Sequence, residues 1–228
     1  MCGRFTITVS FAELMMRYFT EIASLSSFEP RYNAAPLQML PAVIHDGKRY
    51  RLGQLRWGLV PSWAKDERMA GKMINARAET LLQKPSYKNL VSRKRCVIPA
   101  DSFYEWKQIG GRKQPMRIMM KDGRIFSFAG LYDIWTNPET GEKLGTFTII
   151  TTSPNELVAK IHTRMPVILD REGEALWLDR SMTDGEALVK LLRPYPAEEM
   201  KAYAVSPIVG NVKNDGPECI AEAMEQVE

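Results

Sequence analysis

Polar capping residues precede three apolar stretches whose spacing is typical of helices. The three pairs are Ser10 with Glu13 before LMMRYF, Ser153 with Glu156 before LVAKI, and Thr183 with Glu186 before ALVKLL. In a capping box, a Ser or Thr and the Glu three residues later satisfy free N–H groups of the first helical turn. The pattern therefore predicts three helices, and a fourth helical stretch is predicted from Ala76 to Leu82, ending before Pro85.

The middle of the chain is typical of β-strands separated by glycine turns. A meander is predicted from FYEWKQI, a Gly110-Gly111 turn, MRIMM, a Lys121-Asp122-Gly123 turn and RIFSFAGLYDIW. The loop TNPETGEKLG leads to TFTIITT, and TITV and RLGQLRWGLV add strands nearer the N-terminus. Because strands and helices do not alternate regularly, we expect an α+β fold with a curled, barrel-like, mainly antiparallel β core and peripheral helices.

Length and composition favour one globular domain over residues 1–228. With 45% hydrophobic and 25% charged residues the chain can bury a sizeable core, and no low-complexity linker divides it. No apolar run approaches the roughly 18 residues of a membrane span, and the N-terminus lacks a secretory signal pattern. Three scattered cysteines fit reduced thiols, so we expect a cytoplasmic protein. With two histidines and no Cys-x-x-Cys pair, we expect no metal and no cofactor.

Cys2 directly follows the initiator methionine. Removal of Met1 would leave a residue that carries both an α-amine and a thiol, and such trimming is chemically plausible because Cys2 and Gly3 are small. The alternative is that Cys2 only begins a buried strand, because a free cysteine behaves as a small hydrophobic residue. Position alone leaves both interpretations open.

Several polar or aromatic side chains lie in segments where packing does not require them. Asn33 in RYNAAP, an expected extended loop, can donate and accept hydrogen bonds, or it can form a simple Asx-turn. Trp63 in WGLVPSW is either a core residue or an exposed surface on which unpaired bases stack. Asn75 and Arg77 are expected at a helix start, two residues apart, so they would not share one helical face.

Glu105 and His162 are the candidate proton carriers. In FYEWK, alternation sends Glu105 to the strand face opposite Tyr104 and Trp106. A solvated glutamate is the commoner explanation, but on a face that lines a cleft, desolvation would raise its pKa. His162 in IHTRMP is expected at or just beyond a helix end, where it is either a dipole partner or a functional group.

Seven short motifs are each weak signals, but their order along the chain resembles that of one known family. They are MCGRF, RYNAAP, WGLVPSW, NARAET, FYEWK, IHTRMPVIL and VSPIVGNVKNDGPECI. Together they resemble the SRAP family, the SOS response-associated peptidases, from Cys2 to about Cys219. The resemblance implies a compact α+β domain with a barrel-like core. It also implies that an N-terminal cysteine, exposed after autoproteolytic removal of the first residue, bonds covalently to abasic sites in single-stranded DNA.

The matched motifs imply a role for each site residue. Cys2 resembles the family's nucleophile, and Asn75, Glu105 and His162 are similar to the residues that surround it. The residues that resemble DNA contacts are Arg4, Asn33, Trp63, Arg77 and Arg164. One position departs from the family pattern, because Ala64 stands where relatives often carry a second aromatic residue. The net charge of +4 is compatible with an anionic partner, and we expect a monomer that binds single-stranded DNA.

An amine and a thiol on one residue suit the chemistry of an abasic site. The ring-opened sugar carries an aldehyde, and an α-amine with a pKa near 7.7–8.0 is about a tenth unprotonated at pH 7, so it can form an imine. The adjacent thiol can then close a five-membered thiazolidine, because well-oriented intramolecular reactions reach effective molarities of about 10⁵–10⁸ M. The expected activities are autopeptidase, covalent capture and abasic-site lyase.

Two alternatives from other functional classes remain open. An N-terminal-nucleophile amide hydrolase, such as a class II glutamine amidotransferase, also begins with a processed Cys-Gly pair. Release of glutamate from glutamine would favour that enzyme. A non-covalent single-strand binding module, in which Cys2 is incidental, predicts tight binding without covalent capture.

Overall fold

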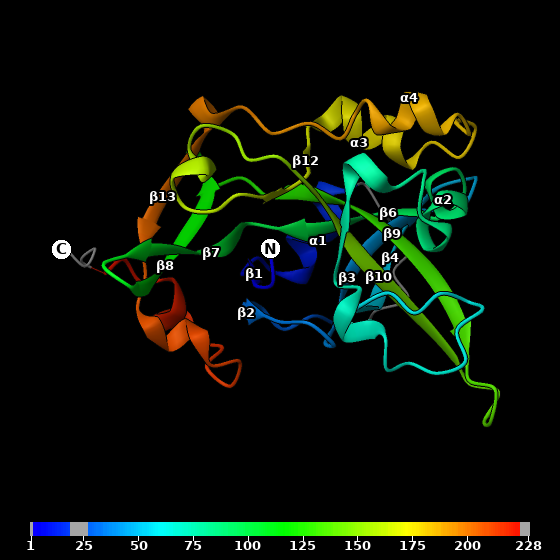
Figure 1. Ribbon diagram of the computed structural model, residues 1–228, viewed down its shortest axis with the longest axis horizontal. Coiled ribbons are helices and arrows are strands. Elements are labelled where there is room, and N and C mark those ends of the chain that lie inside the picture. The colour runs from blue at the N-terminus through cyan, green and yellow to red at the C-terminus, as the bar shows by residue number, and fades with distance from the viewer. Residues whose placement is uncertain (1, 19–26, 224–228) are drawn as a thin grey trace.

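Five strands close into a barrel, which occupies the right-hand half of the molecule in Figure 1. The computed structural model describes residues 2–18 and 27–223. Around the barrel the order is β10, β4, β3, β6, β9 and again β10. Their bounds are β3 Met39–His45, β4 Tyr50–Trp57, β6 Arg95–Ala100, β9 Phe126–Thr136 and β10 Lys143–Thr152. The β4–β10 pair is parallel and the other four are antiparallel, which confirms the predicted barrel-like, mainly antiparallel core.

Aromatic side chains fill the barrel interior. Phe5 enters from outside the ring, and its ring lies 5.1 Å from that of Trp57 and 5.6 Å from that of Phe128. Trp57 stacks on Phe147 at 6.2 Å, and all four side chains are fully buried. Aromatic pairs at these separations add stability beyond the area they bury. Phe5 therefore anchors the chain three residues after Cys2.

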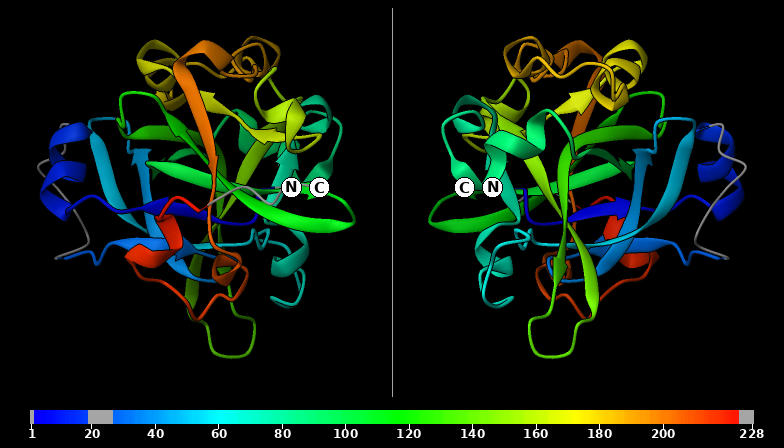
Figure 2. Two further views of the ribbon diagram at one scale, coloured as in Figure 1. Left: turned by 90° about the vertical axis from the view of Figure 1, so that its left-hand side faces the viewer. Right: turned by 90° about the vertical axis from the view of Figure 1, so that its right-hand side faces the viewer.

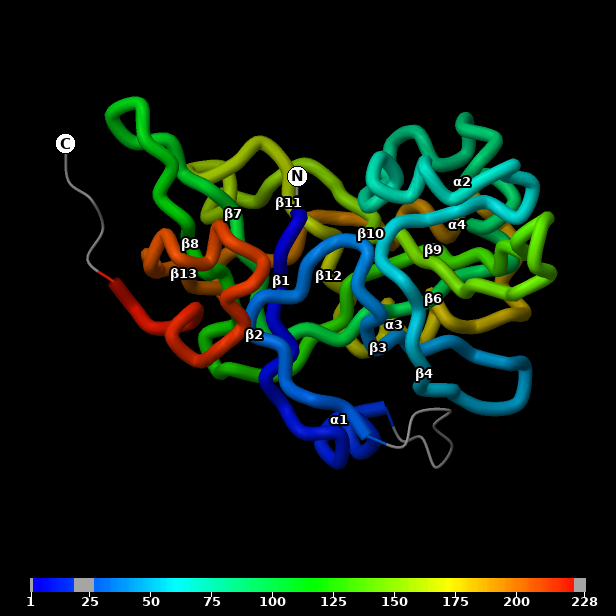
Figure 3. The backbone as a smooth tube through the Cα atoms, turned by 90° about the horizontal axis from the view of Figure 1, so that it is seen from below, coloured from blue at the N-terminus to red at the C-terminus, as the bar shows by residue number. Residues whose placement is uncertain are grey.

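A second sheet carries the N-terminal strand beside the barrel. Its order is β13, β8, β7, β1 and β2, with every pair antiparallel. The bounds are β1 Phe5–Ile7, β2 Arg31–Ala34, β7 Ser102–Ile109, β8 Arg112–Met120 and β13 Met200–Ala204. Figure 3 shows β1 in the middle of this side of the molecule, between β2 and β7. The β7–β8 hairpin turns at Gly110-Gly111, as predicted. The prediction that the meander continues into β9 is wrong, because β8 pairs with β13 while β9 belongs to the barrel.

Short helices and strands surround the two sheets, which confirms the α+β class. The helices are α1 Phe11–Arg17, α2 Pro85–Val91, α3 Arg171–Leu178 and α4 Gly185–Val189, and the short strands are β5 Asn75–Arg77, β11 Met165–Pro166 and β12 Ile168–Leu169. Figure 2 shows α3 and α4 at one side of the molecule and the turn between β9 and β10 at the other. Within the described ranges, no helix has the length and apolarity needed to cross a membrane.

The capping predictions have different outcomes. The Ser10–Glu13 box starts α1 as predicted, although Phe19 at the end of that stretch lies outside the described residues. The helix predicted after Ser153 is wrong in type, because the segment forms only a 3₁₀ turn over Val158–Lys160, whose start is capped by the side chain of Asn155. In α4 the cap is Asp184, one residue later than predicted, because its carboxylate accepts the N–H groups of Glu186 and Ala187.

Two local predictions are wrong because tertiary pairing overrides local preference. Asn75–Arg77 is strand β5, paired in parallel with β10, and only a 3₁₀ turn over Ala78–Thr80 follows it. RYNAAP is not an extended loop, because Arg31–Ala34 forms strand β2 against β1. Both segments are too short to fold alone, and each gains backbone hydrogen bonds from a neighbouring strand that is distant in the sequence.

Candidate functional site

Cys2 lies inside the protein, at the start of the segment that becomes β1. Its side chain is fully buried, and its Sγ lies 3.9 Å from the backbone oxygen of Arg4. Burial raises the pKa of the Cys2 thiol strongly, and the nearby negative charge of Glu105 raises it further. The group is therefore a thiol and not a thiolate at neutral pH, so any reaction at sulfur needs a proton acceptor.

Glu105 is a buried carboxyl group on β7. The strand sends its side chain to the opposite face from Tyr104 and Trp106, as predicted from alternation. Only 2% of Glu105 is exposed, so the solvated-strand interpretation is wrong. Burial raises the pKa of Glu105, and the charge of His162 opposes that rise. A carboxyl group whose pKa is raised towards neutrality can both take up and release a proton.

His162 follows the 3₁₀ turn Val158–Lys160, close to the position expected from the sequence. Its backbone N–H donates to the oxygen of Val158 at 2.8 Å, which continues the turn by one residue. The ring Nδ1 lies 3.1 Å from the backbone N and 3.2 Å from the backbone oxygen of Arg164, so the backbone of Arg164 holds one edge of the ring and Nε2 lies on the other. That Nε2 lies 3.9 Å from Oε2 of Glu105.

A cleft of about 590 Å³ opens at these two residues. Its walls come from β7, β8, the segment after the 3₁₀ turn and the loop that follows β13. The lining residues are Glu105, Trp106, Gln108, Lys113, Ile161, His162, Thr163 and Gly210. Sequence reasoning did not single out Lys113 or Gly210. The β7–β8 register places Lys113 opposite Gln108, so the hairpin prediction could have found it.

Asn75 and Arg77 share one face of β5, because strand side chains alternate and Ala76 between them is buried. The Nδ2 of Asn75 donates to the oxygen of Ile74 at 3.1 Å. Its Oδ1 is buried and has no hydrogen-bond partner among the described residues. A buried acceptor without a donor is costly, and a donor group on a bound molecule would remove that cost. Arg77 is exposed to solvent.

Arg164 lies beside these residues and makes its contacts within the protein. Its guanidinium pairs with both carboxylate oxygens of Glu79, at 2.8 and 3.0 Å, and its Nη2 donates to the oxygen of Thr151 at 2.8 Å. Only 18% of its side chain is exposed. Thr151 is also the register partner of Arg77, so Arg164 and Arg77 lie at the same end of β10.

Arg4 and Asn33 together hold the loop after β13. The Nη1 of Arg4 donates to Oδ1 of Asn33 at 3.1 Å and to the oxygen of Val209 at 2.8 Å, and its Nη2 donates to Gly210. The fully buried amide of Asn33 donates to three backbone oxygens of the loop, those of Val209, Asn211 and Asn214. Since Gly210 lines the cleft, these two side chains shape its wall, and Asn33 itself is closed to solvent.

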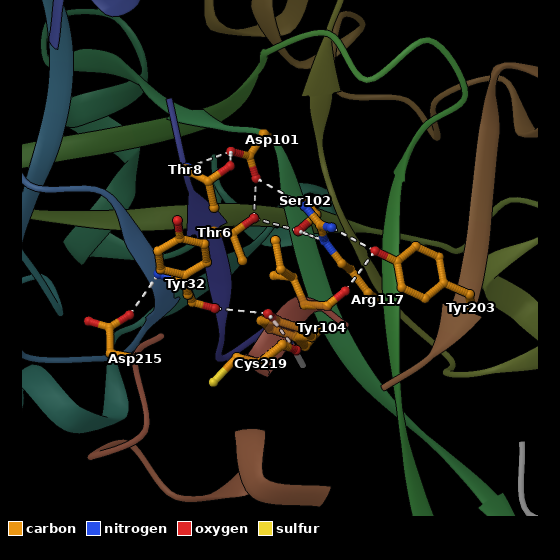
Figure 4. Close-up of polar contacts among 11 residues, drawn as sticks. Thr6, Thr8, Tyr32, Asp101, Ser102, Tyr104, Arg117, Tyr203, Asp215 and Cys219 are labelled. Carbon is orange, nitrogen blue, oxygen red and sulfur yellow. Dashed lines mark hydrogen bonds and ion pairs between the residues drawn. The ribbon is translucent and has the colours of Figure 1, made fainter. Parts of the chain in front are cut away.

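A buried polar network joins β1 to the neighbouring strands of the second sheet (Figure 4). Asp101 accepts hydrogen bonds from the hydroxyl groups of Thr6 and Thr8 on the N-terminal segment. The guanidinium of Arg117 donates to Ser102 at 2.8 Å and to the hydroxyl of Tyr203 at 2.6 Å. The network therefore joins β1, β7, β8 and β13 and fixes the strand that follows Cys2.

Trp63 lies apart from this group, in the loop that joins β4 to β5, and 63% of it is exposed. The structure thus places Cys2, Glu105 and His162 near one another. The backbone of Arg164 contacts the ring of His162. No group of three or more metal-ligating side chains occurs within residues 2–18 and 27–223.

The family model described as "SOS response associated peptidase (SRAP)" matches residues 1–212. The chain is 51% identical over 222 residues to "Abasic site processing protein YoqW" of Bacillus subtilis, covering 96% of this chain and 99% of that one. It is 37% identical to "Abasic site processing protein HMCES" of Gallus gallus, covering 96% of this chain and 77% of that one.

Solved structures share the fold. A crystal structure of a protein from Bacteroides thetaiotaomicron superposes with a TM-score of 0.88 at 30% identity, covering 98% of this chain and all of that one. A protein from Bordetella bronchiseptica superposes with a TM-score of 0.75 at 27% identity, covering 90% of this chain and all of that one.

Proposed function

The chain belongs to the SOS response associated peptidase family, and on that premise we propose that it processes abasic sites in single-stranded DNA. In this proposal, Met1 is removed and Cys2 then captures the ring-opened sugar covalently as a thiazolidine. Relatives that are 51% and 37% identical carry the name abasic site processing protein.

The observation that carries the proposal is the grouping of three reactive side chains. A buried carboxyl group with a raised pKa and an imidazole at 3.9 Å from it line one cleft. The buried thiol at position two lies near enough for the charge of that carboxyl group to raise its pKa. A structural cysteine does not need a proton carrier as its neighbour. A nucleophile that must lose a proton does need one.

The proposed capture uses each group once. The α-amine of Cys2 adds to the sugar aldehyde, and loss of one water gives an imine. The thiol then adds across the C=N bond, so a carbon–sulfur bond forms while the thiol proton passes to nitrogen. Glu105 would carry that proton, since its raised pKa lets it accept from sulfur and donate to nitrogen near neutral pH.

The surrounding residues have separate proposed roles. Asn75 would accept a hydrogen bond from the sugar through its buried Oδ1. His162 would donate from Nε2 to the sugar oxygen during ring opening, or assist elimination of the downstream phosphate. Arg77 would contact phosphate without regard to base sequence. Arg4, Asn33 and Arg164 make internal contacts, so their proposed contribution is to hold the walls around the site.

Removal of Met1 is the proposed peptidase step. One water is consumed, the bond between Met1 and Cys2 breaks, and methionine leaves with the α-amine of Cys2 set free. Glu105 is also the proposed proton carrier here, because it lies near enough to Cys2 for its charge to raise the pKa of the thiol. A fully buried Cys2 must become accessible before capture, and loss of the preceding residue is the proposed trigger.

Intact-mass spectrometry tests the proposal directly. The purified protein should lack the mass of one methionine residue, and after mixing with single-stranded DNA that carries an abasic site it should gain the mass of the strand minus one water. A strand with a tetrahydrofuran spacer, which lacks the aldehyde, should give no adduct. Binding without an adduct would favour the non-covalent single-strand module instead.

A further inference from the structure

The backbone on both sides of the exposed Trp63 is held by hydrogen bonds. The N–H of Ser62 donates to Oδ2 of Asp133 at 2.8 Å. The oxygen of Ala64 accepts from Nε1 of Trp135, also at 2.8 Å. A residue whose two neighbours are both fixed has little backbone freedom, although Trp63 itself is 63% exposed.

The loop packs on the outer face of the β9–β10 pair. Asp133 and Trp135 are two residues apart on β9, so they share one face. Thr146 is the register partner of Asp133 on β10, and its hydroxyl accepts the N–H of Val60 at 2.9 Å. Side chains from two neighbouring barrel strands therefore hold the loop at Val60, Ser62 and Ala64.

Asp133 is a buried carboxylate with several partners. Only 3% of it is exposed, and its Oδ1 accepts from Nζ of Lys94 at 2.5 Å and from the N–H of Ile134 at 2.8 Å. Burial of a charge is costly unless it is paired and hydrogen-bonded. The other carboxylate oxygen, Oδ2, accepts the N–H of Ser62, so this buried carboxylate also fixes the backbone of the Trp63 loop.

Trp135 packs as well as donates. It is 4% exposed and forms a small apolar cluster with Val60, Ala64 and Ala70. Position 64 thus faces inward, and its small side chain leaves room for the Trp135 ring. Ala64, which stands where relatives often carry an aromatic residue, is therefore part of the packing beneath the loop. Trp63 is the aromatic residue that the loop exposes.

We propose that Asp133 and Trp135 are positioning residues that hold Trp63 as a rigid stacking surface for an unpaired base of the bound strand. The inference rests on the proposed function, because it takes single-stranded DNA as the ligand. A loop backbone that is already ordered loses little conformational freedom on binding, so more of the stacking energy is retained as affinity. Loss of one stacked base corresponds to about 5- to 150-fold in affinity.

The test is a double-mutant cycle built on Trp135→Phe. This variant keeps a ring in the cluster but removes the N–H that Ala64 accepts. Trp177→Phe is the matched control, because Trp177 is also buried and its Nε1 donates to the oxygens of Cys96 and Gly130, away from the loop. Each variant is made alone and with Trp63→Ala. Affinity is measured for a single strand with a tetrahydrofuran spacer, and amide exchange is measured over residues 60–66 of the free protein.

The expected result has three parts. Trp135→Phe should speed amide exchange over residues 60–66 and weaken binding by about threefold to tenfold, whereas Trp177→Phe should do neither. In the Trp63→Ala background, Trp135→Phe should change affinity by less than about twofold. Asp133→Asn, which loses the charge paired with Lys94, should behave like Trp135→Phe.

Two outcomes would overturn the inference. One is unchanged affinity in Trp135→Phe and Asp133→Asn while Trp63→Ala weakens binding. The other is an equal loss in the presence and absence of Trp63, which would give Trp135 a structural role only. Failure of the proposed function looks different. If single-stranded DNA is not the ligand, the unaltered protein shows no affinity for the strand, while the exchange data still report how the loop is held. If capture is not covalent, an abasic strand gives no adduct, while the affinities in this cycle are unchanged.

Discussion

The Nε2 of His162 lies 3.9 Å from Oε2 of Glu105, with the histidine side chain 27% exposed and the glutamate side chain 3% exposed. Glu105 is therefore the inner residue of the pair, and His162 is the outer one. The carboxyl group is enclosed and its pKa is raised by burial, while the imidazole is open to the cleft. In the proposed mechanism, this pair would carry protons between the enclosed Cys2 and the cleft.

Replacement of Glu105 by Gln should slow reversal of a preformed adduct and impair removal of Met1. Gln keeps the shape of the side chain but cannot carry a proton, and general acid–base groups contribute about 10²–10⁴-fold. The measurement is a competition, in which excess abasic strand of another length is added to the adduct and exchange is followed by mass. Glu105→Asp should retain part of the activity. If Glu105→Gln exchanges at the rate of the unaltered protein, His162 takes over the proposed role.

The same substitution should change how stability depends on pH. Burial raises the pKa of Glu105 above its ordinary value of 4.5, so the folded state binds the proton more tightly than the unfolded state. The resulting stability is fully present below pH 4.5 and is lost as pH rises through the folded-state pKa. Glu105→Gln has no such loss, so its free energy of unfolding relative to the unaltered protein should increase from pH 4.5 to pH 8 in urea titrations. A constant difference across this range would contradict the raised pKa.

Replacement of Cys2 by Ala should abolish the covalent adduct and leave most of the non-covalent affinity, because the basic side chains remain. Cys2→Ser should form an adduct that hydrolyses faster, since oxygen closes a less stable ring. Cys96→Ala is the control, because Cys96 is an equally buried thiol on a barrel strand. Denaturing gels and intact mass give the yield, and an adduct of unaltered yield and lifetime in Cys2→Ala would exclude the thiazolidine.

Arg77 and Arg164 should differ in their effect on the salt dependence of DNA binding. Arg77 is exposed, so Arg77→Ala should reduce the log–log salt slope by about 0.7, the value for one phosphate contact on a single strand. Arg164 is paired with Glu79, so Arg164→Ala should lower stability and change the slope less. Equal slopes for Arg77→Ala and the unaltered protein would give Arg77 a structural role.

Replacement of Asn33 by Ala should destabilise the fold by about 2–4 kcal/mol, because three loop oxygens and Arg4 each lose a partner in a buried site. Asn211→Ala is the matched control, because Asn211 is exposed and its side chain accepts only the nearby N–H of Lys213. Urea unfolding measures both. A loss below about 0.5 kcal/mol in Asn33→Ala would mean that the loop after β13 is held by other contacts.

Periodicity and turn chemistry predicted the barrel strands β4, β9 and β10, but they did not predict β3 or β6. The alternation in FYEWKQI and the Gly110-Gly111 turn predicted the β7–β8 hairpin, and the Ser10–Glu13 box predicted the start of α1. Local signals failed where pairing is long-range. Asn75–Arg77 carries a helical pattern, yet it pairs with β10, because the backbone hydrogen bonds of a sheet edge outweigh a weak local preference.

The sequence by itself determined which reactive groups are present and where strands alternate. It placed a thiol at position two and put Glu105 on the face opposite two aromatic neighbours, and the order of its motifs indicated the family. Only the tertiary structure decided which of these groups are enclosed. Glu105 is buried and Asn33 is turned inward because segments distant in the chain pack over them. Burial and proximity depend on that packing, and no local pattern encodes either one.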